Sequence, residues 1–308
     1  MDIGILTIAT GKKRYIDMAK TLAISLKLNF PDVSRALVTD SDDPELKNLF
    51  DHIILPDKEI QLSFLQKTNI YNYSPYKKTL FIDADCMVVR DIRFLFDLFD
   101  GKPVSVMGKT IKEGVLFGTD LNKIKNTIAF DFIPVFNGGV YYFEKNLMAQ
   151  KVFEDVLFII KNYEHMGINK HRGDLADEPI MALAMGMNHM LPVDDKNSGM
   201  YTPVGQHGQF RMDVLKGYCE FMKREQLVKP AIMHFGGGYP EAFHYRREKA
   251  KLKLVYYYKL PRFLASPIIN ITWNPTYVMY VFVYRLIKKV VKGGKLKLKP
   301  LLPMFRFE

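Results

Sequence analysis

Residues 79–89 of the chain read TLFIDADCMVV. This run is so apolar that it predicts a strand in the middle of a sheet, with both faces covered. Before it, β-branched runs such as IGILTIAT at 3–10 alternate with the amphipathic spacing of a helix over 15–28. Further strands are predicted over 34–40 and 52–56. This β-α-β-α order favours a doubly wound α/β sheet with its ligand crevice at the carboxyl ends of the strands.

Apolar periodicity predicts the remaining elements of the chain. We expect helices over 44–50, 60–78 (broken before Ser74-Pro75), 91–99, 146–165 and from Asp177. We expect strands over 130–143, with a polar, glycine-rich interruption, and over 231–238. The 146–165 helix is expected to bury a stripe formed by Leu147, Val152, Phe153, Val156, Leu157 and Ile160. No repeat or linker is evident before about residue 258. Residues 1–258 are therefore expected to form one domain and residues 259–308 a distinct segment.

Composition limits the class of protein. The 308 residues are 48% hydrophobic and 25% charged, which excludes a disordered or collagen-like chain. Two cysteines, Cys86 and Cys219, cannot form a disulfide framework, so we expect a reducing compartment. The N-terminus has no basic stretch before its apolar run and predicts a first strand, not an export signal. These features favour a cytoplasmic protein.

The positive charge is concentrated at the C-terminus. The chain carries a formal charge of +11, and residues 259–308 alone hold ten basic side chains and one acid, which amounts to +9. A nucleic-acid-binding protein would spread its charge over a docking face, so no nucleic-acid partner is expected.

Within this tail, residues 277–291 interleave an apolar and a basic stripe at helical spacing, and the apolar run is too short to span a membrane. The pattern predicts a basic amphipathic helix lying on an anionic lipid surface, or a C-terminal helix packed on the domain with solvated lysines.

Asp83-Ala84-Asp85 is the clearest candidate for chemistry. On a strand, residues i and i+2 point to the same face, so the two carboxylates are expected side by side directly after the apolar stretch TLFI (79–82). Such a pair repels unless a cation or hydrogen-bond donors neutralise it. Hard oxygen ligands suit Mg²⁺ or Mn²⁺. The alternative is two solvated acids at a strand end.

Five segments, in order along the chain, together resemble the family 8 glycosyltransferases. They are TIAT with Tyr15 and a helix ending in SL (7–26), YKKTLFIDAD (76–85), FNGGVYYF (136–143), DEPIMALAM (177–185) and MHFGGG (233–238). The resemblance implies a GT-A fold, in which a mixed Rossmann-like sheet is flanked by helices, with a nucleotide-sugar donor and a divalent metal.

The resemblance also implies roles for individual residues. Asp83, Asp85 and His234 match the metal ligands, Asp83 also matches a ribose contact, and Thr7, Ala9 and Tyr15 match the uridine pocket. Lys78 matches a basic residue that holds a phosphate or sugar hydroxyl, and Asn137, Gly138 and Gly139 match the sugar site. Each has a structural alternative: a core histidine for His234, a packing residue for Tyr15, an exposed lysine for Lys78, and a β-bulge for the Asn-Gly-Gly run.

Two positions depart from the family pattern. Asp177 and Glu178 occupy its Asp-Gln pair, and a glutamate, unlike a glutamine, can accept a proton. Glu178 therefore leaves open whether the anomeric configuration is retained or inverted, and Asp174 is a further candidate acid. Pro240 stands where the family has a diphosphate-binding lysine. Arg246, Arg247 or Lys249 could replace that lysine, or backbone N–H groups around Gly237 could bind the phosphate.

The residues and the resemblance together imply a metal-dependent hexosyltransferase that uses a UDP-sugar, a Mn²⁺ or Mg²⁺ ion and a glycan or glycolipid acceptor. Retention is the favoured stereochemistry, and the inner face of the membrane is the expected location. A sugar nucleotidyltransferase is the alternative enzyme, but the segment 7–15 lacks the glycine-rich triphosphate loop expected of one. A non-catalytic module that binds glycans or lipid surfaces is the other alternative.

Overall fold

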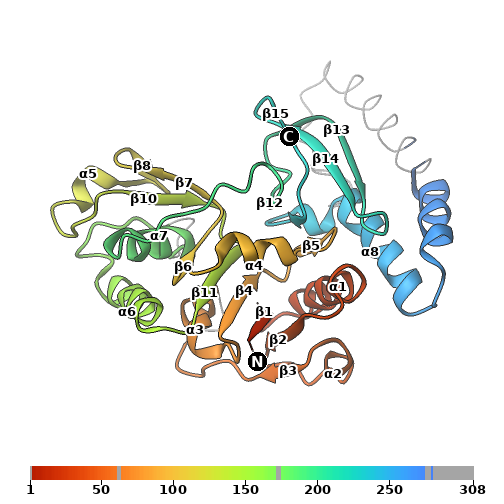
Figure 1. Ribbon diagram of the computed structural model, residues 1–308, viewed down its shortest axis with the longest axis horizontal. Helices are drawn as coiled ribbons and strands as arrows, with labels where there is room; N and C mark the ends of the chain where they lie inside the picture. The colour runs from red at the N-terminus through yellow and green to blue at the C-terminus, as the bar shows by residue number, and fades with distance from the viewer. Residues whose placement is uncertain (1, 61–63, 171–174, 275–278, 280–308) are drawn as a thin grey trace, which may run out of the picture.

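The computed structural model describes residues 2–60, 64–170, 175–274 and 279. Its centre is a six-stranded sheet in the order β3-β2-β1-β4-β11-β6 (Figure 1). The strands β1 to β4 are parallel, whereas β11 runs antiparallel to both β4 and β6. Their bounds are β1 Ile3–Ile8, β2 Ser34–Val38, β3 His52–Ile54, β4 Lys78–Ile82, β6 Val104–Ser105 and β11 Val140–Glu144. The predicted mixed α/β sheet is confirmed.

Within the described residues, the shorter strands form four separate sheets. β5 (Cys86–Val88) pairs with β16 (Ile232–His234), which in turn pairs with β12 (Met200–Tyr201). The others form two ribbons and a three-stranded unit: β7 (Gly108–Ile111) with β10 (Ile133–Phe136), β8 (Val115–Leu116) with β9 (Thr119–Asp120), and β13 (Gln206–Asp213), β14 (Tyr218–Lys223) and β15 (Gln226–Val228).

Helices cover the two faces of the central sheet. They are α1 Lys13–Asn29, α2 Leu46–Leu49, η1 Phe64–Asn69, α3 Ile70–Tyr73, α4 Arg93–Phe99, α5 Leu121–Ile124, α6 Leu147–Asn162, α7 Asp177–Met187, η2 Tyr239–Glu241 and α8 Phe243–Tyr256. In Figure 1, α5 and α7 lie toward one end of the molecule and α1 and α8 toward the other. Alternate residues of β4 enter different cores: Phe81 packs with the α6–α7 side, and Leu80 and Ile82 pack with α1 and α4. Because both faces are buried, this strand is almost wholly apolar.

The run 79–89 is two strands, not the single strand predicted. β4 ends at Ile82 in the central sheet, and β5 begins at Cys86 in the sheet that contains β16. Asp83, Ala84 and Asp85 form the turn between them, so the two carboxylates do not share a strand face as predicted. The polar, glycine-rich interruption predicted within 130–143 is confirmed: Asn137-Gly138-Gly139 separates β10 from β11, and the two strands belong to different sheets.

Two helix predictions need correction. The segment predicted as a helix over 60–78 contains the short η1 and α3, and its last residue already belongs to β4. In α6, Leu147 is 86% exposed and Leu157 is 39% exposed, whereas Val152, Phe153 and Val156 are buried as predicted. Leu147 is the first helical residue and lies outside the buried face, which Ala149 begins.

The first part of the segment predicted over 259–308 packs on the domain. A helix over 262–274 follows α8, and its Ala265 and Ile269 are buried against the domain. Ser266 donates a hydrogen bond to Asp213 of β13. Residues up to 274 therefore pack on the domain as part of it. The amphipathic helix predicted over 277–291 falls, apart from Met279, outside the described residues. Among the helices that are described, none has the length and apolar character needed to cross a membrane.

Candidate active site

The turn between β4 and β5 is held by main-chain hydrogen bonds. The Asp83 N–H donates to the Gly139 carbonyl, and the Cys86 N–H donates to the Asp83 carbonyl, both at 2.9 Å. The buried Thr7 hydroxyl donates to the Ile82 carbonyl just before the turn. These bonds place the two carboxylates beside the Asn137-Gly138-Gly139 break between β10 and β11.

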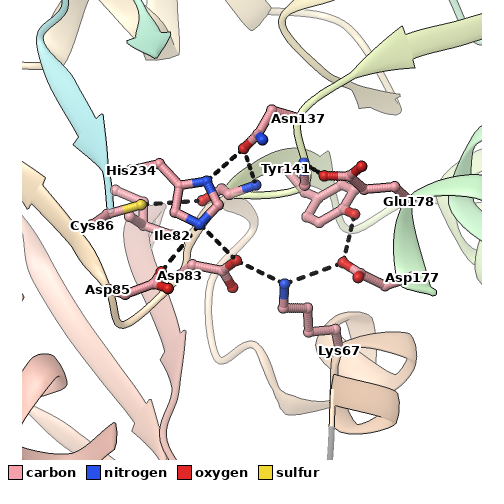
Figure 2. Close-up of polar contacts among 12 residues, drawn as sticks. Lys67, Ile82, Asp83, Asp85, Cys86, Asn137, Tyr141, Asp177, Glu178 and His234 are labelled. Atoms are coloured by element: carbon pink, nitrogen blue, oxygen red, sulfur yellow. Dashed lines mark hydrogen bonds and ion pairs between the residues drawn. The ribbon is translucent and has the colours of Figure 1, made fainter. Parts of the chain in front are cut away.

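His234 joins this turn from the end of β16. Its Nε2 lies 3.2 Å from Asp85 Oδ1 and 3.7 Å from Asp83 Oδ2 (Figure 2). Its Nδ1 lies 2.6 Å from Asn137 Oδ1, which also accepts the Gly139 N–H at 3.1 Å. Since Asn137 Oδ1 is an acceptor in both contacts, Nδ1 carries a hydrogen, and Nε2 is the nitrogen that gains or loses a proton. A neutral His234 therefore directs a lone pair at the two carboxylates.

Lys67 links the two acidic halves of the site. Its Nζ lies 2.7 Å from Asp83 Oδ2 and 3.1 Å from Asp177 Oδ2. The Tyr141 hydroxyl also donates to Asp177 Oδ2, at 2.9 Å. Burial raises the pKa of Asp83 to about 6, although the charge of Lys67 opposes that shift. For Lys67 itself, burial disfavours the charged form, but the charges of Asp177 and Asp83 outweigh it and raise the pKa.

Glu178 lies next to Asp177 in a different electrostatic environment. Its Oε1 accepts the Gly138 N–H at 2.5 Å. Burial raises the pKa of Glu178 to about 7, although the Gly138 hydrogen bond opposes the shift. Glu178 therefore exchanges a proton near neutral pH. The two neighbouring carboxyl groups are thus suited to different tasks, one held by Lys67 and Tyr141 and the other able to move a proton.

The site contains atoms that could hold a metal ion. Asp85, Cys86 and His234 offer ligand atoms within 4.8 Å of one another. Burial raises the pKa of the Cys86 thiol well above its usual value, and its Sγ lies 3.8 Å from the Gly139 carbonyl, so it remains a protonated donor. Burial opposes the charged form of His234, but the hydrogen bond and charge of Asp85 raise its pKa. The carboxylates and the imidazole are therefore better ligands than the thiol, and hard divalent cations fit this oxygen and nitrogen set.

Most of the predicted site residues come together here. Asp83, Asp85, Asn137, Asp177, Glu178 and His234 converge with Gly138 and Gly139 (Figure 2). The glycines are needed for close approach, because a Cβ on Gly138 would lie 2.7 Å from Glu178 Cγ and one on Gly139 would lie 2.7 Å from His234 Nδ1. The metal, sugar and catalytic roles of these residues stay predictions.

The residues predicted for the nucleotide lie around the end of β1. Thr7 is 1% exposed and its hydroxyl donates a hydrogen bond to the Ile82 carbonyl. Its side chain therefore supports the turn instead of facing a ligand. Ala9 is also buried and donates its N–H to the Val38 carbonyl. Tyr15 is half-buried, with the Arg14 guanidinium 4.7 Å above its ring. Gly237 is exposed with φ +68°, beyond the strand that carries His234. Asp174 lies outside the described residues.

The structure does not bring Lys78 to this cluster, whereas Lys67, which no sequence motif indicates, reaches it. Lys78 begins β4 and forms an ion pair with Asp100. Five residues at about 3.3 Å each place it roughly 16 Å from Asp83, at the opposite end of the strand. Lys67 is the basic group that reaches the site. No motif marks it, because its partners are 16 and 110 residues away in the sequence.

The comparisons with known proteins concern the fold. No protein-family model matches the sequence, and no curated protein matches it significantly. A solved structure of the galactosyltransferase LgtC, in complex with donor and acceptor sugar analogs, is similar over 77% of this chain and 87% of its own, with 13% identity and a TM-score of 0.51. An active-site mutant of LgtC is similar over 77% of this chain and 88% of its own, with 14% identity and a TM-score of 0.50.

The chain has a GT-A fold. At these identities the similarity establishes the architecture alone. In the GT-A fold of this chain, the cluster around Asp83 lies at the carboxyl edge of the parallel strands, which is where open α/β sheets bind ligands.

Proposed function

We propose that the chain is a metal-dependent glycosyltransferase that moves a hexose from a UDP-sugar to a glycan or glycolipid acceptor. The observation that carries the proposal is the convergence of Asp83, Asp85 and His234 at the carboxyl edge of β4. Four carboxyl groups gather there, with Lys67 as the neighbouring lysine. This excess of acid favours a site completed by a divalent cation.

The carboxylate oxygens and the imidazole nitrogen of this cluster are suitable ligands for Mn²⁺ or Mg²⁺. Asp83, Asp85 and His234 would hold the ion, and once bound it would neutralise the diphosphate as it leaves the sugar. Asn137 fixes the imidazole through Nδ1, so that Nε2 stays directed at the carboxylates. Lys67 holds Asp83 and Asp177 in one arrangement and provides a fixed positive charge between them.

We assign different roles in sugar transfer to Glu178 and Asp177. Asp177, held by Lys67 and Tyr141, is placed to orient a sugar hydroxyl or stabilise a positive anomeric carbon. We propose retention of the anomeric configuration, following the resemblance of the sequence segments. The pKa of Glu178, raised to about 7 by burial, is the observation that favours inversion, because an inverting enzyme needs a carboxylate base for the acceptor hydroxyl.

A cavity beside Asn137 is a suitable acceptor site. It has a volume of about 330 Å³ and is lined by Tyr201, Thr202, Lys223 and Asp195 among others. An aromatic ring with a hydroxyl, an ammonium and a carboxylate around it provides the stacking face and hydrogen-bond groups that a sugar requires. Because Asn137 contacts His234, the cavity borders the site directly.

Calorimetric titration of UDP with and without Mn²⁺ tests the proposed function. We expect UDP to bind more tightly with the ion, and Asp85→Asn to weaken that binding at least tenfold by removing a charged ligand. Asp97→Asn, on the exposed face of α4, is the matched control. Equal affinity for UDP with and without Mn²⁺ would contradict a metal-dependent donor site. A screen of UDP-sugars followed by NMR of the product anomer then identifies the donor and the stereochemistry.

We further propose that the C-terminal side of the protein binds the anionic inner face of the cytoplasmic membrane. The helix over 262–274 exposes Phe263, Leu264, Ile268 and Ile271. The sequence of 259–308 is rich in basic residues, which favour an anionic lipid surface. Truncation after residue 274 keeps the buried Ala265 and Ile269. We expect it to reduce cosedimentation with phosphatidylglycerol vesicles several-fold, with phosphatidylcholine vesicles as the control. If the truncated chain binds phosphatidylglycerol vesicles as well as the full chain does, residues 275–308 do not contribute to membrane binding.

A further inference from the structure

A second polar cavity lies away from the cluster around Asp83. Its volume is about 420 Å³, and it lies between the first turns of α1, η2, α8 and the helix over 262–274. Four basic side chains line it: Arg14, Arg246, Lys249 and Lys253. Lysine and arginine rarely gather around one cavity unless something neutralises them.

The basic residues of α8 fall into two groups. Lys251 is fully buried, with its Nζ 3.0 Å from both Asp213 and Glu248, and Arg247 forms a 2.8 Å ion pair with Glu248. On the cavity side, by contrast, neither Arg246 nor Lys249 has a carboxylate within 4 Å in the part of the chain that the structure describes. The same helix thus neutralises its inward cations and leaves its cavity-facing cations without acidic partners.

The other lining residues compensate this charge only in part. Two carboxylates border the cavity: Asp17, which lies 3.2 Å from Lys13, and the exposed Glu241. Burial lowers the pKa of Lys249 and the charge of Lys253 lowers it further, and the opposing charges of Asp17 and Glu241 do not cancel the shift. An anion inside the cavity would relieve both effects.

We propose that this cavity is a binding site for a phosphate-bearing group, held by Arg246, Lys249 and Arg14. The guanidinium groups provide paired N–H donors that match phosphate oxygens, and the lysines provide point charges. Arg14 already donates to the Tyr15 hydroxyl at 2.8 Å and lies over that ring, which limits the positions of its remaining donors.

The cavity is separate from the proposed metal site. None of Asp83, Asp85, Asp177, Glu178 and His234 lines it. The nearest link in sequence is Pro240, which lines the cavity six residues after His234. Anion binding is therefore expected without any metal, and it does not depend on sugar transfer being the function of the chain.

Trp273 makes the site directly observable, because it is the only tryptophan in the chain and it lines the cavity. The experiment titrates the full chain, in EDTA, with pyrophosphate, with UDP, and with phosphatidylglycerol or phosphatidylcholine vesicles. Tryptophan fluorescence reports the location, and calorimetry reports binding independently.

We expect saturable binding of pyrophosphate or of phosphatidylglycerol, with a change in Trp273 emission. The double variant Arg246→Gln/Lys249→Gln should weaken it at least tenfold, since two charge-assisted contacts are lost. The control Lys216→Gln/Arg224→Gln removes the same charges at exposed positions elsewhere. Asp85→Asn should leave the anion binding unchanged, which separates this result from the test of the metal site.

The two sources of phosphate are distinguished by the ligands. Binding of pyrophosphate or UDP indicates a soluble phosphate compound. A response to phosphatidylglycerol vesicles alone, lost in Arg246→Gln/Lys249→Gln, indicates a lipid headgroup. The proposal is overturned if neither fluorescence nor heat changes with any phosphate ligand, or if the cavity variant and the control variant weaken binding equally.

Discussion

Replacing Gly139 by alanine tests whether His234 must occupy its observed position. An ideal Cβ at Gly139 would lie 2.7 Å from His234 Nδ1 and 2.9 Å from its Cγ. Since nonbonded carbon contacts settle near 3.5–4.0 Å, the imidazole must move by roughly 0.8 Å. The movement disrupts the 2.6 Å contact between Nδ1 and Asn137 Oδ1, and it shifts Nε2 relative to Asp85.

Two quantities follow from this displacement. Overpacking of this kind lowers the free energy of unfolding by about 1–3 kcal/mol. Loss of the support for a metal-binding histidine weakens metal affinity by about 10–100-fold. Urea denaturation measures the first quantity, and calorimetric titration of Mn²⁺ in the presence of UDP measures the second.

A double-mutant cycle with His234→Ala provides the control for Gly139→Ala. With the ring removed, the added methyl group has room, so the second substitution should cost almost no further stability or affinity. If the two effects add, or if Gly139→Ala binds Mn²⁺ and UDP as tightly as the unmodified chain, the assigned contact between Gly139 and His234 does not position a ligand.

Two further substitutions probe the charges of the site. Burial raises the pKa of Glu178 from 4.5 to about 7, so the stabilising protonated form is lost as the pH rises through this interval. At about 1.4 kcal/mol per pH unit, the ionised glutamate costs roughly 3 kcal/mol, which Glu178→Gln should recover in urea denaturation at pH 8 but not at pH 4. Lys67→Met leaves Asp83 and Asp177 without their shared cation and should lower the free energy of unfolding by about 3–5 kcal/mol. Thermal unfolding should show that Mn²⁺ restores part of this loss.

Each of these substitutions has an outcome that would count against it. Glu154→Gln, at an exposed position of α6, should leave the pH dependence of stability unchanged. The same slope in Glu178→Gln and in the unmodified chain would mean that Glu178 is not protonated near pH 7. For Lys67→Met, a thermal unfolding curve that does not respond to Mn²⁺ would show that the two carboxylates do not share a cation site.

Local sequence patterns predicted the elements well where one element buries one continuous face. The apolar stripe of α1 and the segment 177–187 of α7 are examples, and the structure confirms both helices. The patterns failed at 60–78, where Ile70 and Tyr73 share the spacing of a buried helix face but lie on the four-residue α3. Apolar spacing reports which side chains are buried, and it does not report how many residues the backbone keeps in one conformation.

The site residues were predicted from sequence motifs. The errors in that prediction have geometric causes. Lys78 was assigned to the site on a resemblance, although strand geometry places it at the wrong end of β4. Lys67 could not be predicted, since its contacts with Asp83 and Asp177 depend on the tertiary arrangement of η1 and α7. Tyr141 could have been identified as a residue of the site. Side chains alternate along β11, so Tyr141 points to the other face of the sheet from Val140 and Tyr142.

Two strand breaks are the origin of the site. The polar, glycine-rich run at 137–139 indicates one of them, whereas the apolar pattern of 79–89 does not reveal the other. At Asp83–Asp85 and again at Asn137–Gly139, the chain leaves one sheet and enters another. Each break frees polar groups from the ladder of a strand, and the bond from the Asp83 N–H to the Gly139 carbonyl holds the two breaks against each other. His234 then closes the cluster from β16, which pairs with β5 only because the chain changed sheets after Asp83. A continuous strand through 79–89 would direct Asp83 and Asp85 along the central sheet and away from His234, so the irregular backbone is what makes a metal site possible here.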